Sequence, residues 1–180
     1  MKKNLVLAAF SLLVFAFAAS AQKTTDFSGT WNLDLAKSTL SEREKGSIES
    51  QTLTITQTAT DIKVETATKR NAPPAGAPAG GPPGGGRGMG PADGPVTYTL
   101  DGKEVKSEIS GQMGSMQVST KAKLDGGKLE ITRTVTTPMG DRVSTEKWSL
   151  GADGTLSIAS QRPNRDGGMD TTTKVYSKKQ

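Results

Sequence analysis

Residues 122–135 read AKLDGGKLEITRTV and decide the fold class of the chain. Apolar residues alternate with polar ones on both sides of Asp125-Gly126-Gly127. Alternation with a period of two predicts β-strands that each have one buried face. A glycine after an aspartate supplies the positive φ angle that a tight turn between antiparallel strands requires. The stretch therefore predicts a β-hairpin.

The same pattern recurs along most of the chain. Alternating runs occupy residues 27–35, 53–55, 62–64, 96–100, 105–109, 116–124, 129–135, 148–150, 156–158 and 175–176. Further turn signals are Asp101-Gly102, Met139-Gly140-Asp141, Asp153-Gly154 and Asp166-Gly167-Gly168. Nine or ten short strands joined by hairpins predict an all-β protein, an antiparallel up-and-down meander. Closure into a barrel is the first expectation because it removes exposed sheet edges. An open twisted sheet or a sandwich is the alternative, since periodicity does not show closure.

Residues 1–21 have the layout of a cleavable signal peptide. Lys2 and Lys3 precede an apolar run over residues 5–18, and the small residues Ala19-Ser20-Ala21 follow it. The run is shorter than the roughly 20 residues that span a bilayer as a helix. We therefore expect export to the periplasm or the medium, and a mature single β domain over 22–180 without a membrane span.

Two segments interrupt the alternation. Residues 70–95 contain nine glycines and seven prolines with almost no large apolar side chain, which predicts a disordered loop inserted between neighbouring strands. Residues 36–47 are charged, and we expect a connection or lid there that holds a short helix near residues 41–45.

The composition excludes several functional classes. The chain has no histidine and no cysteine, so it can form neither a Ser-His-Asp triad nor a thiolate or histidine metal site. The aspartates lie at turns, where they cap backbone amides, and no calcium-loop spacing occurs, so no metal or cofactor is expected. The net charge of +5 forms no basic stripe with stacking aromatics, which argues against nucleic acid as a partner.

Two short motifs resemble a known group of barrels. Gly29-Thr30-Trp31 resembles the G-x-W signature of lipocalins and fatty-acid-binding proteins, the calycin group. Lys174-Val175-Tyr176 is similar to the Arg-x-Tyr pair with which fatty-acid-binding proteins hold a ligand carboxylate. The resemblance implies a lipocalin-like barrel with an internal ligand, and Arg133 as the second internal cation. A lysine replaces the arginine fork with a point charge, and a helix-turn-helix lid is not evident in residues 36–47.

Six residues are singled out for structural or binding roles. Gly29, Trp31 and Trp148 are expected to be structural, with Trp31 closing one end of the barrel. Either Lys174 and Tyr176 or the intervening valine points inward. Arg133 shares a strand face with apolar residues, so it either meets a ligand anion or reaches water from a strand end.

These observations lead to one preferred function and two alternatives. The preferred function is an exported, non-enzymatic protein that binds a small apolar or amphipathic molecule through Arg133, Lys174 and Tyr176. A structural or protein-interaction module with a filled barrel is the second. An enzyme that depends on a carboxylate or a tyrosine is the third, and it would need two inward polar groups with matched pKa values.

Overall fold

The structure, a computed structural model, describes residues 25–72, 95–111, 114–138, 140–164 and 166–179. These residues form ten strands and one short helix. In chain order they are β1 (Gly29–Thr39), α1 (Glu42–Ser47), β2 (Ile48–Gln57), β3 (Asp61–Arg70), β4 (Val96–Thr99), β5 (Asp101–Gly111), β6 (Gly114–Asp125), β7 (Lys128–Thr137), β8 (Gly140–Leu150), β9 (Leu156–Pro163) and β10 (Met169–Lys178). The predicted all-β class and strand number are confirmed.

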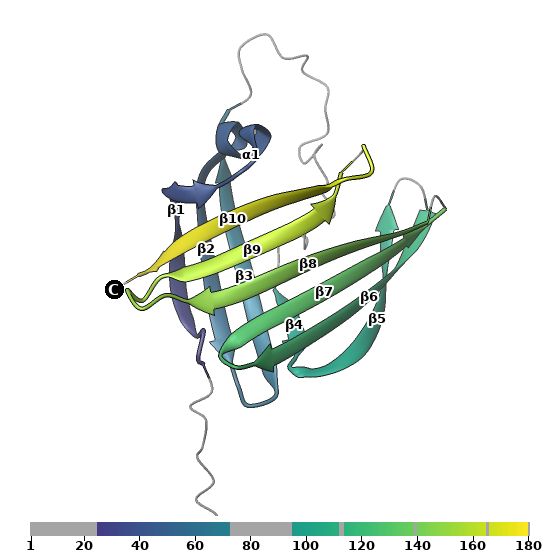
Figure 1. Cartoon of the computed structure of the whole chain (residues 1–180), viewed down its shortest axis with the longest axis horizontal. Coiled ribbons are helices and arrows are strands. Elements are labelled where there is room, and N and C mark those ends of the chain that lie inside the picture. Colours follow the sequence, from purple (N-terminus) through teal and green to yellow (C-terminus); the bar gives the residue numbers. More distant parts are fainter. Residues whose placement is uncertain (1–24, 73–94, 112–113, 139, 165, 180) are drawn as a thin grey trace, which may run out of the picture.

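All ten strands belong to one antiparallel sheet, in the order β4-β3-β2-β1-β10-β9-β8-β7-β6-β5. The first and last strands of the chain are neighbours, with Trp31 opposite Lys178 and Leu33 opposite Tyr176. The sheet curls until β4 comes close to β6, which gives a nearly closed up-and-down barrel (Figure 1). The barrel, rather than an open sheet or a sandwich, is therefore the fold.

The apolar core fills the end of the barrel that the β2–β3, β6–β7 and β8–β9 turns surround. Trp31, Trp148 and Phe27 are at most 3% exposed there, and the Phe27 and Trp148 rings meet edge to face with centroids 6.1 Å apart. The Trp31 indole N–H donates to the Phe27 carbonyl at 2.9 Å. This layer, which we call the floor, also contains Ile62, Leu129, Leu156 and Tyr176.

Gly29 shows why a glycine precedes Trp31. Its φ angle of +136° lies in a region that side-chain-bearing residues rarely adopt. A Cβ built at this position would lie 2.7 Å from Cε of Lys178 on β10. Lys178 itself extends over Trp31, with its Nζ 5.3 Å from the ring centroid. The absence of a side chain at Gly29 thus leaves room for the Lys178 side chain, which reaches over Trp31 from β10.

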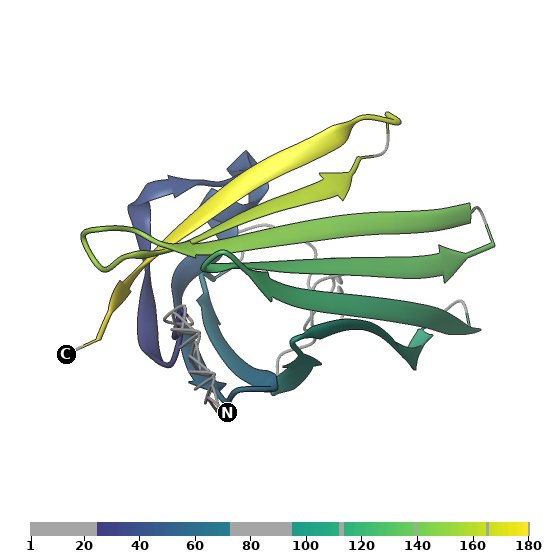
Figure 2. The same cartoon turned by 60° about the horizontal axis from the view of Figure 1, so that its bottom comes forward.

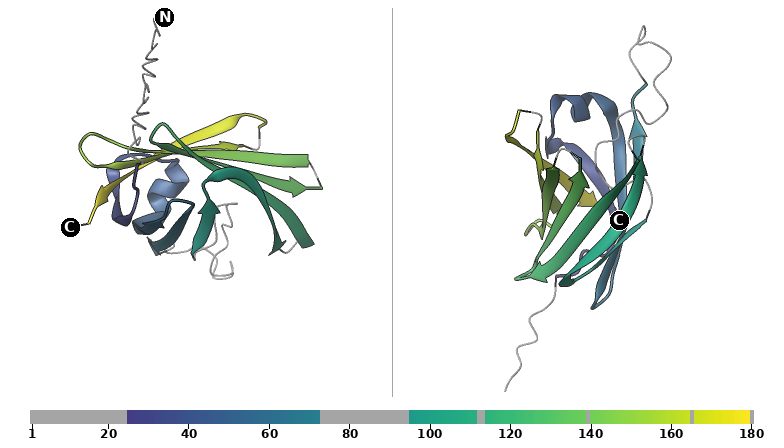
Figure 3. Two further views of the ribbon diagram at one scale, coloured as in Figure 1. Left: turned by 90° about the horizontal axis from the view of Figure 1, so that it is seen from below. Right: turned by 90° about the vertical axis from the view of Figure 1, so that its right-hand side faces the viewer.

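The helix α1 lies at the opposite end of the barrel from the β2–β3 turn (Figures 1 and 3). Ser41 is its N-cap, and the Ser41 hydroxyl accepts a hydrogen bond from the Glu44 amide at 3.3 Å. The sequence placed a short helix near residues 41–45, and the structure has it at Glu42–Ser47. Residues 36–47 hold this single helix, without a second one to form a helix-turn-helix.

The Gly/Pro-rich segment follows β3 and precedes β4, and these strands pair with each other, as Ile62 opposite Tyr98 shows. The segment thus connects neighbours in one sheet. Its predicted disorder concerns mainly residues 73–94, which lie outside the described residues, as does the predicted signal peptide over 1–21. Within the described residues, no helix has the length and apolarity that a membrane crossing demands.

Candidate binding site inside the barrel

Lys174 and Tyr176 both face the interior of the barrel. Tyr176 is 2% exposed and lies opposite Leu33 on one side and Leu156 on the other. Lys174 is two residues away on β10, opposite the buried Ile158. Since side chains on one strand alternate between faces, the pair points inward and Val175 points outward. The open question of which face is internal is settled in favour of the pair.

Arg133 also lies on the inner face, halfway along β7. It follows Ile131 and precedes Val135 on that face, and both are at most 3% exposed. Its cross-strand neighbours are Thr120 on β6 and Ser144 on β8. Because Arg133 is not at a strand end, the expectation that it reaches water from there is wrong.

Glu146 is a central member of the site that sequence reasoning missed. It faces inward on β8, opposite Ile131 and Ser160. One carboxylate oxygen lies 4.0 Å from the Arg162 guanidinium, and the other accepts a hydrogen bond from the Trp148 indole at 3.3 Å. A negative charge therefore sits directly above the floor.

Arg162 and Tyr98 were missed as well, and both share the inner face with residues that had been recognised as apolar. Arg162 follows the buried Ile158 and Ser160 at alternate positions of β9. Tyr98 lies on β4 opposite the buried Ile62. Tyr98 stands within the alternating run 96–100, so its inward position was available from the sequence, whereas Arg162 lies beyond the last apolar residue of its run.

Tyr176 anchors a hydrogen-bond chain that runs from β10 to β2 and β3. Its hydroxyl donates to the Gln51 side-chain carbonyl at 2.7 Å, and the Gln51 amide donates to the Thr68 hydroxyl at 2.8 Å. Burial, reinforced by the Glu146 and Glu44 carboxylates, raises the pKa of Tyr176 well above its usual value of 10.0. This phenol is therefore neutral at physiological pH and acts as a donor.

Tyr98 is held neutral for the same reason. Burial raises the pKa of Tyr98 to about 12, the Glu146 carboxylate adds to the rise, and the Arg133 guanidinium opposes it. The charges of Glu146 on β8 and Arg133 on β7 thus both influence the Tyr98 phenol on β4.

Lys174 connects the interior of the barrel to α1 through an ion pair. Its ammonium nitrogen lies 3.8 Å from a Glu44 carboxylate oxygen on α1, and its side chain is only 19% exposed. Burial lowers the pKa of Lys174; the Arg162 and Arg70 charges also lower it, whereas Glu44 and Glu146 oppose the change. The lysine therefore lies among charges of both signs.

We call the group of Arg133, Glu146, Arg162, Lys174 and Tyr98 the polar layer. With Glu44, the ion-pair partner of Lys174, the group has three cations and two carboxylates, which leaves an excess of positive charge. The side chains of Glu146 and Arg162 are 24% and 42% exposed, whereas the floor beneath them is almost completely buried. The polar layer is thus partly accessible to solvent, and its chemistry suits an anionic or hydrogen-bonding group.

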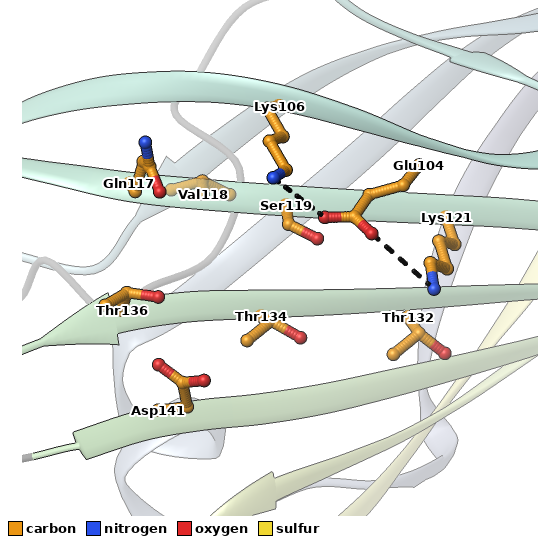
Figure 4. A pocket seen from close by; sticks show the side chains of 10 residues that line it. All are labelled: Glu104, Lys106, Gln117, Val118, Ser119, Lys121, Thr132, Thr134, Thr136 and Asp141. Carbon is orange, nitrogen blue, oxygen red and sulfur yellow. Dashed lines mark ion pairs between the residues drawn. The ribbon is translucent and has the colours of Figure 1, made fainter.

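A groove of about 310 Å³ lies elsewhere, on the outer face of β5 to β8 (Figure 4). Thr132, Thr134 and Asp141 line it, and Glu104 lies 4.0 Å from Lys106 and 3.7 Å from Lys121 there. Thr132 and Thr134 flank Arg133 in sequence and therefore point to the opposite side of the sheet. The groove is a solvated outer surface, separate from the polar layer. Across the described residues, no cluster of three or more acidic side chains could hold a metal ion.

Comparisons with known proteins show the fold. No protein-family model and no curated protein matches the chain. Among solved structures, a secretory abundant heat soluble protein from Ramazzottius varieornatus has a TM-score of 0.51 at 14% identity, over 86% of this chain and 96% of that one. Lipid binding protein 8 from Caenorhabditis elegans, without ligand, has a TM-score of 0.53 at 14% identity, over 85% and 95%. The resemblance to lipocalin-like and fatty-acid-binding-protein-like barrels is confirmed at the level of the fold.

Proposed function

We propose that this protein is an exported, non-enzymatic binding protein that takes up a small, partly apolar ligand in the half of its barrel nearer to α1. Arg133, Lys174 and Tyr176 contact the polar end of the ligand, with Arg162 beside them. The observation that carries this proposal is the partly buried polar layer above a filled apolar floor.

Charged side chains inside a barrel cost stability. Moving an ionised group out of water is unfavourable unless partners compensate for it, and apolar residues of similar size often serve the fold better. The ion pairs of the polar layer are loose, at 4.0 Å for Glu146–Arg162 and 3.8 Å for Lys174–Glu44. Their presence is therefore better explained by a ligand than by stability.

The filled floor limits where a ligand can lie. Trp31, Trp148 and Tyr176 occupy the closed end, so the ligand sits between the polar layer and α1. Val96 and Met116 lie on the inner face near this level and are only partly buried. They offer contacts to the apolar part of a ligand.

Three further observations support the proposal. One protein with this fold is by name a lipid binding protein, and another is by name secretory. The layout of residues 1–21 supports export. The raised pKa values of Tyr98 and Tyr176 make both phenols poor general bases at neutral pH, which supports a binding role over tyrosine-dependent catalysis.

A filled structural or protein-interaction module is the second candidate. The tightly packed floor favours this candidate, because apolar side chains fill that end of the barrel and leave no room for a ligand. The two candidates differ in whether the polar layer has an occupant.

Native mass spectrometry of the protein purified from its own host without detergent separates them. We expect an added mass that survives gentle ionisation and is lost in Arg133→Ala and Lys174→Ala. Lys121→Ala, which removes a lysine from the outer face, is the matched control and should retain it. The same spectrum tests export, since cleavage after Ala21 would give a chain that begins at Gln22. A bare protein that also takes up nothing from lipid mixtures would favour the filled module.

A further inference from the structure

The strand β5 differs from every other long strand of the sheet because it is exposed on both faces. Val105 and Ser107 point to the inner side, yet both are exposed, and Val105 retains 50% of its accessible surface. By contrast, Val118 and Val135, on the inner face of the next two strands, are each 2% exposed. Among the residues that the structure describes, no neighbour covers the barrel wall at β5.

β5 is also the terminal strand of the sheet. Its one strand partner is β6, and no strand among the described residues pairs with its other edge. Figure 2 shows β5, in dark teal, along the margin of the sheet. The pairing of β5 with β6 has a bulge between Asp101 and Glu104, so the regular edge of β5 begins at Glu104. Unpaired backbone groups on such an edge can accept another strand.

The sequence of this edge is complementary to itself in one antiparallel register. When Ser107 lies opposite its own copy, Val105 faces Ile109 on the inner side. On the outer side, Lys106 faces Glu108, and the symmetry repeats both pairs. Opposite charges and paired apolar side chains are the contacts that stabilise neighbouring strands. A shift by two residues, which places Lys106 opposite itself, would instead bring Glu104 against Glu108.

The charges on the edge are available for such pairing. Glu108 is exposed and makes no ion pair within the described part of the chain. Lys106 has a single loose contact, 4.0 Å from Glu104, and its side chain is 69% exposed. Neither side chain would have to give up a close partner.

We propose that two copies of this protein associate through β5, edge to edge and antiparallel, with Ser107 at the two-fold axis. The contact is isologous, so it closes at a dimer and leaves no further β5 edge exposed. It joins the two sheets into one and covers Val105 with Ile109 of the second copy. The interface is small, and the dimer is therefore weak and concentration-dependent.

Cross-linking tests the register directly, because the chain has no cysteine of its own. The complete coding sequence is expressed so that the host carries out any processing. Under mild oxidation, Ser107→Cys should give a disulfide-linked dimer, since its two copies would lie within disulfide distance. Ser119→Cys on β6 is the matched control and should form dimers about tenfold more slowly or less. Equal rates for the two variants would overturn the proposal.

A charge swap tests the same register without a covalent bond. Sedimentation equilibrium should show association that Lys106→Glu weakens about tenfold, since it places like charges opposite each other at two symmetric positions. Glu108→Lys should do the same, and Lys106→Glu combined with Glu108→Lys should restore the original association. These positions are exposed, and circular dichroism confirms that each variant folds. A wild-type chain that stays monomeric at millimolar concentration, or a double variant that fails to recover, would refute the edge pairing.

Discussion

The floor and the polar layer of the barrel share the strands β7 to β10 but are built from different side chains. On β8, Trp148 belongs to the floor and Glu146, two residues away on the same face, belongs to the polar layer. On β10, Tyr176 and Lys174 divide in the same way. The alternation that decides which side chains point inward is the same at both levels. Strand geometry therefore fixes the direction of a side chain, whereas the choice of residue at each depth separates the part that holds the fold from the part available for binding.

The largest effect is expected in the floor. Leu129→Ala removes a side chain that is completely buried, and it should lower the free energy of unfolding by about 2–5 kcal/mol. Val143→Ala, at a valine that is 44% exposed, should cost less than about 0.5 kcal/mol. Urea unfolding of both variants measures the difference. Equal losses would mean that the floor is not the stabilising part of the barrel.

The hydrogen bond between Tyr176 and Gln51 should have an intermediate effect. Tyr176→Phe keeps the ring in the floor but leaves the Gln51 side-chain carbonyl without its donor, which should cost about 1–3 kcal/mol. If the loss comes from this bond, adding Gln51→Leu should give a combined loss smaller than the sum of the two single losses. Additive losses in urea unfolding would contradict a direct contact.

Alkaline pH should weaken the fold through the buried phenols. The unfolded chain ionises tyrosine near pH 10.0, whereas Tyr98 in the folded chain keeps its proton to about pH 12, so its contribution is fully present below pH 10.0 and is lost above it. Each such tyrosine should cost roughly 1 kcal/mol per pH unit across this window. The lowered pKa of Lys174 acts in the opposite direction, since the folded chain releases that proton first. Tyr98→Phe should reduce the loss between pH 10 and pH 11 in urea unfolding, and an unchanged loss would assign it to other groups.

The smallest effect on stability is expected in the polar layer. Lys174→Met removes a loose ion pair and fills similar space, so the free energy of unfolding should change by less than about 1 kcal/mol. The bound mass in native spectra should nevertheless disappear. Lys121→Met on the outer face should leave both quantities unchanged. A large loss of stability in Lys174→Met would place this lysine among the residues that hold the fold.

The sequence predicted the floor better than the polar layer. Trp31, Leu129 and Leu156 stand in runs whose apolar residues mark the inner face directly. Glu146 carries no such mark, because the face of Trp148 could not be assigned from β8 alone. Its position follows only from the cross-strand register, which places it opposite Ile131.

The same limit applies to depth along the barrel. Arg133 was recognised because apolar residues flank it on its own strand. Arg162 lies beyond the last apolar residue of β9. Polar residues occupy both faces of the strand there, so the sequence does not distinguish inner from outer positions. The stagger between neighbouring strands determines which charged side chains lie at the same depth in the barrel. The residue pattern of a single strand does not contain this stagger.

The pairing of β1 with β10 has a kinetic consequence. The strand that closes the barrel begins at Met169, near the C-terminus, and its partner begins at Gly29. Contacts so distant in sequence form slowly, and this one cannot form before the last residues of the chain are available. Every other strand pair of the sheet joins strands that are consecutive in sequence, so a chain that lacks β10 can pair these strands locally but cannot close the barrel between β1 and β10.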